Sequence, residues 1–244
     1  MYTSFYLIRH YLLSEGGIMN FQSLAITFFI IGIFSIVLGL TWSHLLFKLK
    51  NQNSYTDEKR DEIRKAQIEA GKRAEQQVRF QLQYLETDDY DIWHNVHLES
   101  NGIRHEFDHL VFSPSGIIHI ETKNYGGDLT FTLNGIEQIK RNYSGNILSQ
   151  KNIKDPTGQL FHHEYLIKSI LSQNKLAEIP VHGILCIANE RATINGSPDG
   201  FHICKDTVLV PYIKQLDRNV DFTSQWRNSI IDLFEQYKIN KEAS

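Results

Sequence analysis

Three charged residues lie on two segments that the sequence predicts to be neighbouring strands. A Ser-Pro-Ser-Gly turn at 113–116 separates the apolar runs 106–112 and 117–122. Pairing residues outward from this turn places Asp108 opposite Glu121. Cross-strand partners on one face lie about 5 Å apart, a distance at which two carboxylates repel each other. A divalent cation between them removes this repulsion, and oxygen ligands suit Mg²⁺ or Mn²⁺, so the pair predicts a metal site.

Lys123 follows Glu121 by two residues and therefore points to the same face of its strand. Phosphodiester hydrolysis needs a metal ion that holds a phosphate oxygen and activates a water molecule. It also needs a cation near the developing negative charge, which Lys123 can supply. The alternative is structural: a surface ion pair between Glu121 and Lys123, with Asp108 an acid close to the turn.

A long uncharged segment precedes this region. Between Asn20 and Phe47 the chain has no Lys, Arg, Asp or Glu. About 20 mostly apolar residues are enough for a helix to cross a membrane, so residues 21–47 predict a transmembrane helix after a short N-terminal segment, 1–20. The alternative is a cleaved signal peptide, but its apolar region would be shorter and a small-residue cleavage site would follow.

The basic residues that flank this segment predict its orientation. Six Lys and Arg side chains follow it within residues 48–65, whereas only Arg9 precedes it. Positive charge accumulates on the cytoplasmic side of membrane proteins. We therefore expect a single-pass membrane protein whose C-terminal domain faces the cytoplasm.

The rest of the sequence predicts one α/β domain, with a mostly mixed β-sheet flanked by helices. Residues 48–70 are expected to form a linker, polar at 51–56, and the start of a charged helix. Residues 71–190 then form the core, and residues 191–244 a C-terminal strand and helix that complete it. The expected strands are 91–98, 106–112, 117–122, 129–133, 181–188 and 208–210, with short β-structure at 134–152 and helices from Pro156 and over 222–237.

Bulk composition restricts the function only weakly. The net charge is −3 and the isoelectric point is near 6.4, whereas nucleic-acid-binding domains are often strongly basic. Local basic patches matter more than the total charge, so a nucleic-acid partner is not excluded. The two cysteines, Cys186 and Cys204, lack the spacing of a zinc site and are expected to be small buried residues.

Three motifs in chain order resemble the nuclease-related domain (NERD) family, within the PD-(D/E)xK nuclease superfamily. The central one is the hairpin from Asp108 to Asn124. The resemblance covers roughly residues 71–187, and one position departs from the family pattern, since Asp155 replaces the usual Asn; Asp caps a helix equally well. The flanking motifs are Gly71-Lys72-Arg73-Ala74-Glu75 and Asp155-Pro156-Thr157-Gly158-Gln159.

The resemblance implies a restriction-endonuclease-like core and a role for each matched residue. Asp108 and Glu121 would bind Mg²⁺ or Mn²⁺ with the main-chain carbonyl of Thr122, and Lys123 would position or polarise the attacking water. Glu75 would be a further metal-binding acid, and Gln159 would reach the site from the later helix. The structural alternatives are a solvated helix acid for Glu75 and a helix residue without a role for Gln159.

Together with the apolar segment at 21–47, the resemblance leads us to expect a membrane-anchored, metal-dependent nuclease that acts on DNA, with RNA as the second choice. The alternative is a non-catalytic module that uses the nuclease fold to bind nucleic acid or a protein. His105-Glu106-Phe107-Asp108-His109 also matches the HExxH pattern of a membrane zinc protease. That chemistry requires both histidines on one helix face, and this segment is predicted to be a strand. His162 and His163 are expected on an exposed helix surface.

Overall fold

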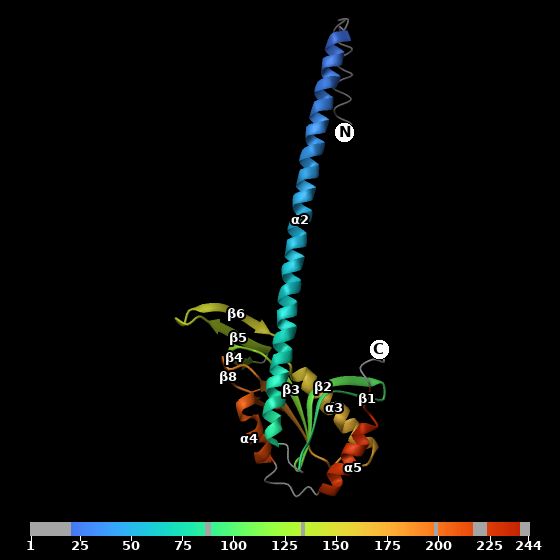
Figure 1. The fold of residues 1–244 in the computed structure, drawn as a ribbon, viewed down its shortest axis with the longest axis vertical. Helices are drawn as coiled ribbons and strands as arrows, with labels where there is room; N and C mark the ends of the chain where they lie inside the picture. Colours follow the sequence, from blue (N-terminus) through green and yellow to red (C-terminus); the bar gives the residue numbers. More distant parts are fainter. Residues whose placement is uncertain (1–20, 86–88, 133–134, 198–199, 217–223, 240–244) are drawn as a thin grey trace. The chain divides into compact units, whose positions relative to one another are not determined.

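The structure is a computed structural model that describes residues 21–85, 89–132, 135–197, 200–216 and 224–239. The expected N-terminal segment 1–20 lies outside these residues. The chain divides into two compact units, residues 1–64 and 65–244. The second unit contains all the sheets and every candidate site residue (Figure 1).

The first unit contains the beginning of helix α2 (Phe21–Leu82). Within this helix, Ile26–Lys48 is 23 residues long, has a mean hydropathy of 2.1 and has none of its side chains buried. By length and composition this segment can cross a membrane. Residues 51–56 are helical, so the predicted linker is wrong. The reason is that they include no Pro or Gly, and nothing in the backbone interrupts the helix.

The second unit is built on a five-stranded sheet in the order β1-β2-β3-β7-β9. The first three strands are antiparallel, and β3, β7 and β9 are parallel. The hairpin between β2 and β3 has the predicted register, from Ser113 opposite Gly116 to His109 opposite Ile120. The strands are β1 (Asp91–Ser100), β2 (Ile103–Ser113), β3 (Gly116–Lys123), β7 (Val181–Ile187) and β9 (His202–Lys205).

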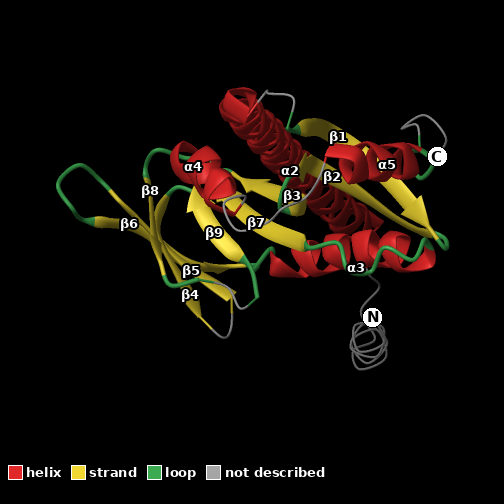
Figure 2. Ribbon diagram, turned by 90° about the horizontal axis from the view of Figure 1, so that it is seen from below, coloured by secondary structure: helices red, strands yellow, loops and turns green. Residues whose placement is uncertain are grey.

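Helices cover both faces of this sheet (Figure 2). On one face, residues 74–82 of α2 pack with α4 (Asp206–Leu216) around Ile118 and Ile120 of β3. On the other face, α3 (Thr157–Gln173) and α5 (Ser224–Glu235) pack around Phe107 and Phe112 of β2. A short 3₁₀ turn, η1 (Gln83–Leu85), directly follows α2. The sheet is therefore buried on both sides, which confirms the predicted mixed α/β class.

A second sheet, which the sequence did not predict as separate, lies beside the first. Its order is β6-β5-β4-β8, and Leu129 and Ile136 join it to Leu160 of α3 and Leu185 of β7. The predicted β-structure between 129 and 152 therefore forms, but in a sheet of its own. The strands are β4 (Gly127–Thr132), β5 (Gly135–Arg141), β6 (Ile147–Ile153) and β8 (Ala192–Asn195).

The predicted strand at 208–210 is wrong, because these residues belong to helix α4. Leu209, Val210 and Ile213 are all buried on one side of it. Their spacing of one, three and four residues is that of a helix face rather than of an alternating strand. The three-residue apolar run alone does not distinguish the two structures.

Substitution of Gly116, the first residue of β3, shows how tightly the hairpin between β2 and β3 is packed. Its φ is +121°, and a Cβ atom there would lie 2.3 Å from the carbonyl oxygen of Pro180. Gly145 also has a positive φ, +82°, but nothing lies within 4 Å of its added Cβ. We expect Gly145→Ala to lower the free energy of unfolding by about 1 kcal/mol, and Gly116→Ala by about 3 kcal/mol or more. Urea unfolding of both variants measures this difference, and equal losses would contradict the packing described.

Candidate active site

The strands β1 and β2 change phase at the position of Asp108. Trp93 and Val96 of β1, and Leu110 and Phe107 of β2, all face the core formed with α3 and α5. In an uninterrupted strand, residues three apart point to opposite faces. Asn95, which lies opposite Asp108 in this register, has a positive φ of +50° and interrupts the ladder. The interruption turns Asp108 out of the regular pleat.

The ladder between β2 and β3 also ends beside Asp108, at His109 opposite Ile120. The carboxylate of Asp108 reaches across to β3, where its Oδ2 accepts a hydrogen bond of 2.8 Å from the main-chain N–H of Thr122. The predicted register is therefore correct as far as His109. Beyond it, the hydrogen bond from the Thr122 N–H to the Asp108 side chain, rather than main-chain pairing, joins β2 to β3. Asp108 remains close enough to Glu121 to raise the pKa of that carboxyl.

Glu121 is an acid buried in the sheet, with an exposed fraction of 3%. Lys123 donates from Nζ to its Oε1 at 2.5 Å, so both side chains lie on one face as predicted. Burial, followed by the charge of Asp108, raises the pKa of Glu121 to about 7, although Lys123 opposes the rise. Burial also raises the pKa of Asp108. A second positive charge at this place would favour the ionised form of both carboxyls.

His163 of α3 faces the other oxygen of the same carboxylate, with Nδ1 3.9 Å from Oε2 of Glu121. It is only 3% exposed, so the predicted exposed surface is wrong for His163, while His162 beside it is exposed. The signal was in the sequence: His163 lies three residues after Leu160 and four before Ile167, both buried, and thus on the apolar stripe of the helix. Burial lowers the pKa of His163 to about 4.

Gln159 lines a pocket of about 230 Å³ together with Lys123. The structure therefore brings the first residues of α3 next to the end of β3, where the resemblance to the family would place Gln159. Tyr125, which the sequence analysis did not select, lies in the same pocket, and burial raises the pKa of its hydroxyl. The remaining lining residues are Lys154, Asp155, Pro156, Gly158 and His162.

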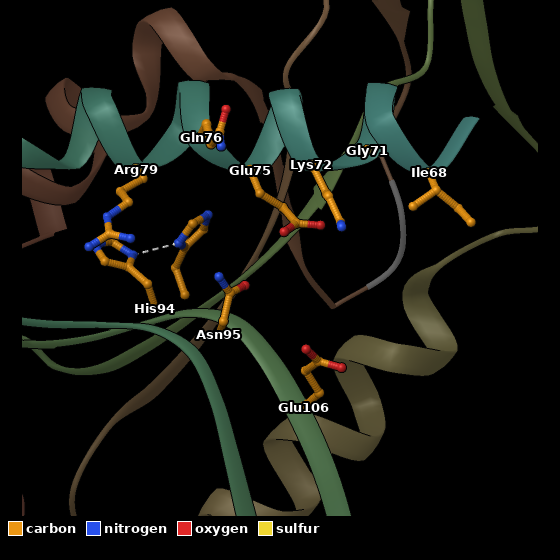
Figure 3. A pocket seen from close by; sticks show the side chains of 10 residues that line it. Ile68, Gly71, Lys72, Glu75, Gln76, Arg79, His94, Asn95 and Glu106 are labelled. Carbon is orange, nitrogen blue, oxygen red and sulfur yellow. Dashed lines mark hydrogen bonds between the residues drawn. The ribbon is translucent and has the colours of Figure 1, made fainter. Parts of the chain in front are cut away.

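Glu75 lies in a different pocket, of about 540 Å³, between α2 and the strands β1 and β2 (Figure 3). Lys72 and Arg79 project from the same helix, and His94 donates or accepts a 2.7 Å hydrogen bond with His109 across the strands. The charge of Glu75 is the weakest of those acting on the pKa of Glu121. Glu75 therefore does not share the pocket of Lys123 and Gln159, although its charge still reaches Glu121.

The chemistry of the oxygen donors fits a hard divalent cation. Asp108 and Glu121 provide two carboxylates, and Asp108 is held beside the main chain of Thr122 by the hydrogen bond from its N–H. Mg²⁺ is commonly bound by one or two carboxylates and several water molecules. Among the residues that the structure describes, no three His, Cys, Asp or Glu side chains converge as a complete metal site. The metal-binding role of these residues therefore stays a prediction.

The HExxH segment lies on strand β2, and its two histidines face opposite sides of the sheet. The ring of His105 packs against His162 and His163 of α3. His109 instead contacts His94 in the pocket beside α2. The phase change at Asp108 separates them, so they do not share a zinc ion in this arrangement, and the zinc-protease alternative has no geometric support.

A mixed sheet with a buried and a half-buried carboxylate, Glu121 and Asp108, and a lysine at the end of its central hairpin defines a nuclease-like α/β domain. Comparison with known families agrees: residues 70–188 match the nuclease-related domain family, which confirms the resemblance seen in the motifs.

An uncharacterized protein of Bacillus anthracis is 29% identical over 104 residues, which are 42% of this chain and 47% of that protein. The match thus spans about half the length of this relative. No solved structure matches the chain significantly.

The buried His119 of β3 should make the stability of the fold depend on pH. It is fully buried, neither ring nitrogen has a partner among the described residues, and burial, then His163, lower its pKa to about 3. The folded protein therefore keeps His119 neutral, whereas the unfolded chain takes up a proton below about pH 6.5. Because of this group, the free energy of unfolding should decrease by about 1.4 kcal/mol for each pH unit below pH 6.5.

We expect His119→Val to be more stable than wild type by about 1–2 kcal/mol at pH 7.5, because two unpaired buried nitrogens are removed. Its stability should also decline less between pH 7.5 and pH 5. Urea unfolding at the two pH values measures both effects. A variant that loses stability as steeply as wild type would show that His119 is not a neutral buried group.

Proposed function

We propose that the chain is a membrane-anchored, metal-dependent nuclease that hydrolyses phosphodiester bonds in DNA, with RNA as the second substrate class. The observation that supports this most is the state of Glu121: it is buried, repelled by Asp108 and paired with Lys123. A purely structural ion pair does not require a second acid beside it. The match of residues 70–188 to the nuclease-related domain family supports the same chemistry.

Each residue has a task in this proposal. Asp108, Glu121 and the Thr122 carbonyl would hold Mg²⁺ or Mn²⁺, which when bound polarises the phosphate and makes a water molecule nucleophilic. Lys123 lines a pocket, where its ammonium group can orient water and stabilise developing negative charge. The amide of Gln159 lines the same pocket and can position a phosphate oxygen or that water. Glu75 would act from the neighbouring pocket.

Basic residues around the end of β3 support a nucleic-acid partner. Lys154 shares the pocket of Lys123 and Gln159. A further pocket, of about 420 Å³, is lined by Asn124, which follows Lys123 in the chain, and by three basic residues, Lys140, Arg141 and Arg191. Arg141 is also paired with Asp128 at 3.1 Å. Lys and Arg side chains in such positions bind phosphates without reading the base sequence.

The membrane part of the proposal rests on the apolar segment Ile26–Lys48. Basic residues follow this segment, and the charge bias favours a cytoplasmic nuclease domain. The nuclease would then act on nucleic acid close to the inner membrane surface.

The test uses the full chain in detergent, incubated with linear, circular and single-stranded DNA and with RNA, in Mg²⁺, Mn²⁺ or EDTA. We expect cleavage of at least one substrate, its loss in EDTA, and a decrease of about 100-fold or more in Lys123→Ala, because a charge at the reacting centre is removed. Lys168→Ala is the matched control, since Lys168 is an exposed α3 lysine paired with Glu164. Binding without cleavage in every metal would instead favour the non-catalytic module.

A further inference from the structure

An arginine with no acid partner among the described residues lines the 540 Å³ pocket that contains Glu75. Arg79 projects from α2 into this pocket and is exposed. Arg73, Arg141 and Arg227, in contrast, are each paired with a carboxylate. The guanidinium of Arg79 therefore keeps its donors and its charge for a ligand that enters the pocket.

The side chains beside Arg79 are neutral rather than acidic. Burial, and then the charge of Arg79, lower the pKa of His94 to about 4, so the ring of His94 is uncharged at neutral pH. His94 and His109 share a hydrogen bond of 2.7 Å between their Nδ1 atoms, and His109 is only 1% exposed. A buried residue thus fixes the ring next to Arg79, and neither histidine neutralises the guanidinium.

Lys72 is a second cation on the same wall of the pocket. It precedes Arg79 by seven residues, which places both on one face of α2 about 10 Å apart along the helix axis. Within the described part of the chain, no ion pair of Lys72 is found. Figure 3 shows the side chains of Lys72 and Arg79 on either side of Glu75. A ligand that contacts both needs more than one anionic group.

The opposite wall of the pocket leads to the candidate metal site. Asn95 lines the pocket, is exposed and lies opposite Asp108 in the register of β1 and β2. Its amide can donate to a phosphate oxygen. Glu75, in the same pocket, acts through its charge on the pKa of Glu121. An anion bound here would therefore lie next to the carboxylates of Asp108 and Glu121.

Two acids restrict where an anion can bind in this pocket. Figure 3 shows Glu106 on the strand side, well apart from Arg79, and its Oε1 lies 3.6 Å from Nε2 of His97. Glu75 lies between the two cations of α2. Anionic groups are therefore favoured at Arg79 and at Lys72, and disfavoured between them. A chain of phosphates meets this requirement, because its charges are separated by uncharged sugars.

We propose that this pocket binds the backbone of a nucleic-acid strand, with Arg79 and Lys72 contacting different phosphates on the two sides of Glu75. The inference rests on the proposed nuclease function and adds the surface that holds the strand beside the cleaved bond. A guanidinium binds phosphate through two parallel hydrogen bonds, and contacts to phosphates are independent of base sequence.

The experiment measures binding of fluorescent DNA and RNA oligonucleotides, single-stranded and duplex, to the full chain in detergent at several salt concentrations. EDTA or Ca²⁺ replaces Mg²⁺ in order to limit cleavage. We expect Arg79→Gln and Lys72→Gln each to weaken binding about tenfold and to lower the slope of log Kd against log salt by about one. Arg79→Lys should retain the slope, because it retains the charge.

Arg73→Gln is the matched control, because Arg73 lies on the same helix, is exposed and is paired with Glu69 at 3.9 Å. This variant should bind like wild type. A measurement on wild type avoids the folding of the variants: phenylglyoxal modifies exposed arginines, and mass spectrometry locates the product. A saturating oligonucleotide should protect Arg79 from modification and leave Arg73 reactive.

Two kinds of result overturn the inference in distinguishable ways. If oligonucleotides bind but Arg79 stays reactive, or if Arg73→Gln weakens binding as much as Arg79→Gln, the strand does not occupy this pocket and the proposed function stands. If wild type binds no oligonucleotide under any of these conditions, the nucleic-acid substrate on which both proposals rest is wrong.

Discussion

The structure of this site depends on the repulsion between two carboxylates that the fold holds close together, one buried and one half-buried. Asp108 and Glu121 are both shielded by the sheet and its helices, and burial raises the pKa of each. Two local contacts partly compensate: the Thr122 N–H bonded to Asp108 and the Lys123 ammonium bonded to Glu121. Together these contacts supply one positive charge, that of Lys123, which leaves two ionised carboxylates with a net negative charge. The arrangement makes physical sense as a cation site.

The rest of the domain serves to hold this pair in place. The left-handed Asn95 breaks the phase of β1 and β2 beside Asp108, and the ladder to β3 stops there. Beyond that point, α3 supplies His163 against Glu121 and Gln159 beside Lys123. Parallel pairing of β3 with β7 places Glu121 next to Leu185 inside the core. The site therefore lies where an antiparallel hairpin meets a parallel pair.

Sequence patterns predicted the features that depend on local chemistry. The Ser-Pro-Ser-Gly turn and the alternation around it led to the hairpin register, and with it the proximity of Asp108, Glu121 and Lys123. The patterns failed where local sequence is compatible with more than one structure. Residues 208–210 suit a strand or a helix, and their packing in α4 makes them helical. Residues 51–56 are polar but contain nothing that breaks a helix, so α2 continues through them. His163 was misplaced because two adjacent histidines suggest a polar surface, although its spacing from Leu160 indicates the buried face. The phase change at Asn95 left a signal that the sequence analysis did not use, since Trp93 and Val96 are three residues apart and both face the same core.

The central claim is that the carboxylates of Asp108 and Glu121 form a divalent-cation site, and metal-dependent stabilisation tests it most directly. We would measure thermal unfolding of wild type and Glu121→Gln in EDTA and with increasing Mn²⁺ or Mg²⁺. A ligand that binds only the folded state at 100 times its dissociation constant adds about 2.7 kcal/mol to its stability. The account predicts that the wild-type melting temperature rises by several degrees with metal and that Glu121→Gln does not respond. A wild-type protein that is indifferent to metal, or a variant that responds equally, would contradict it.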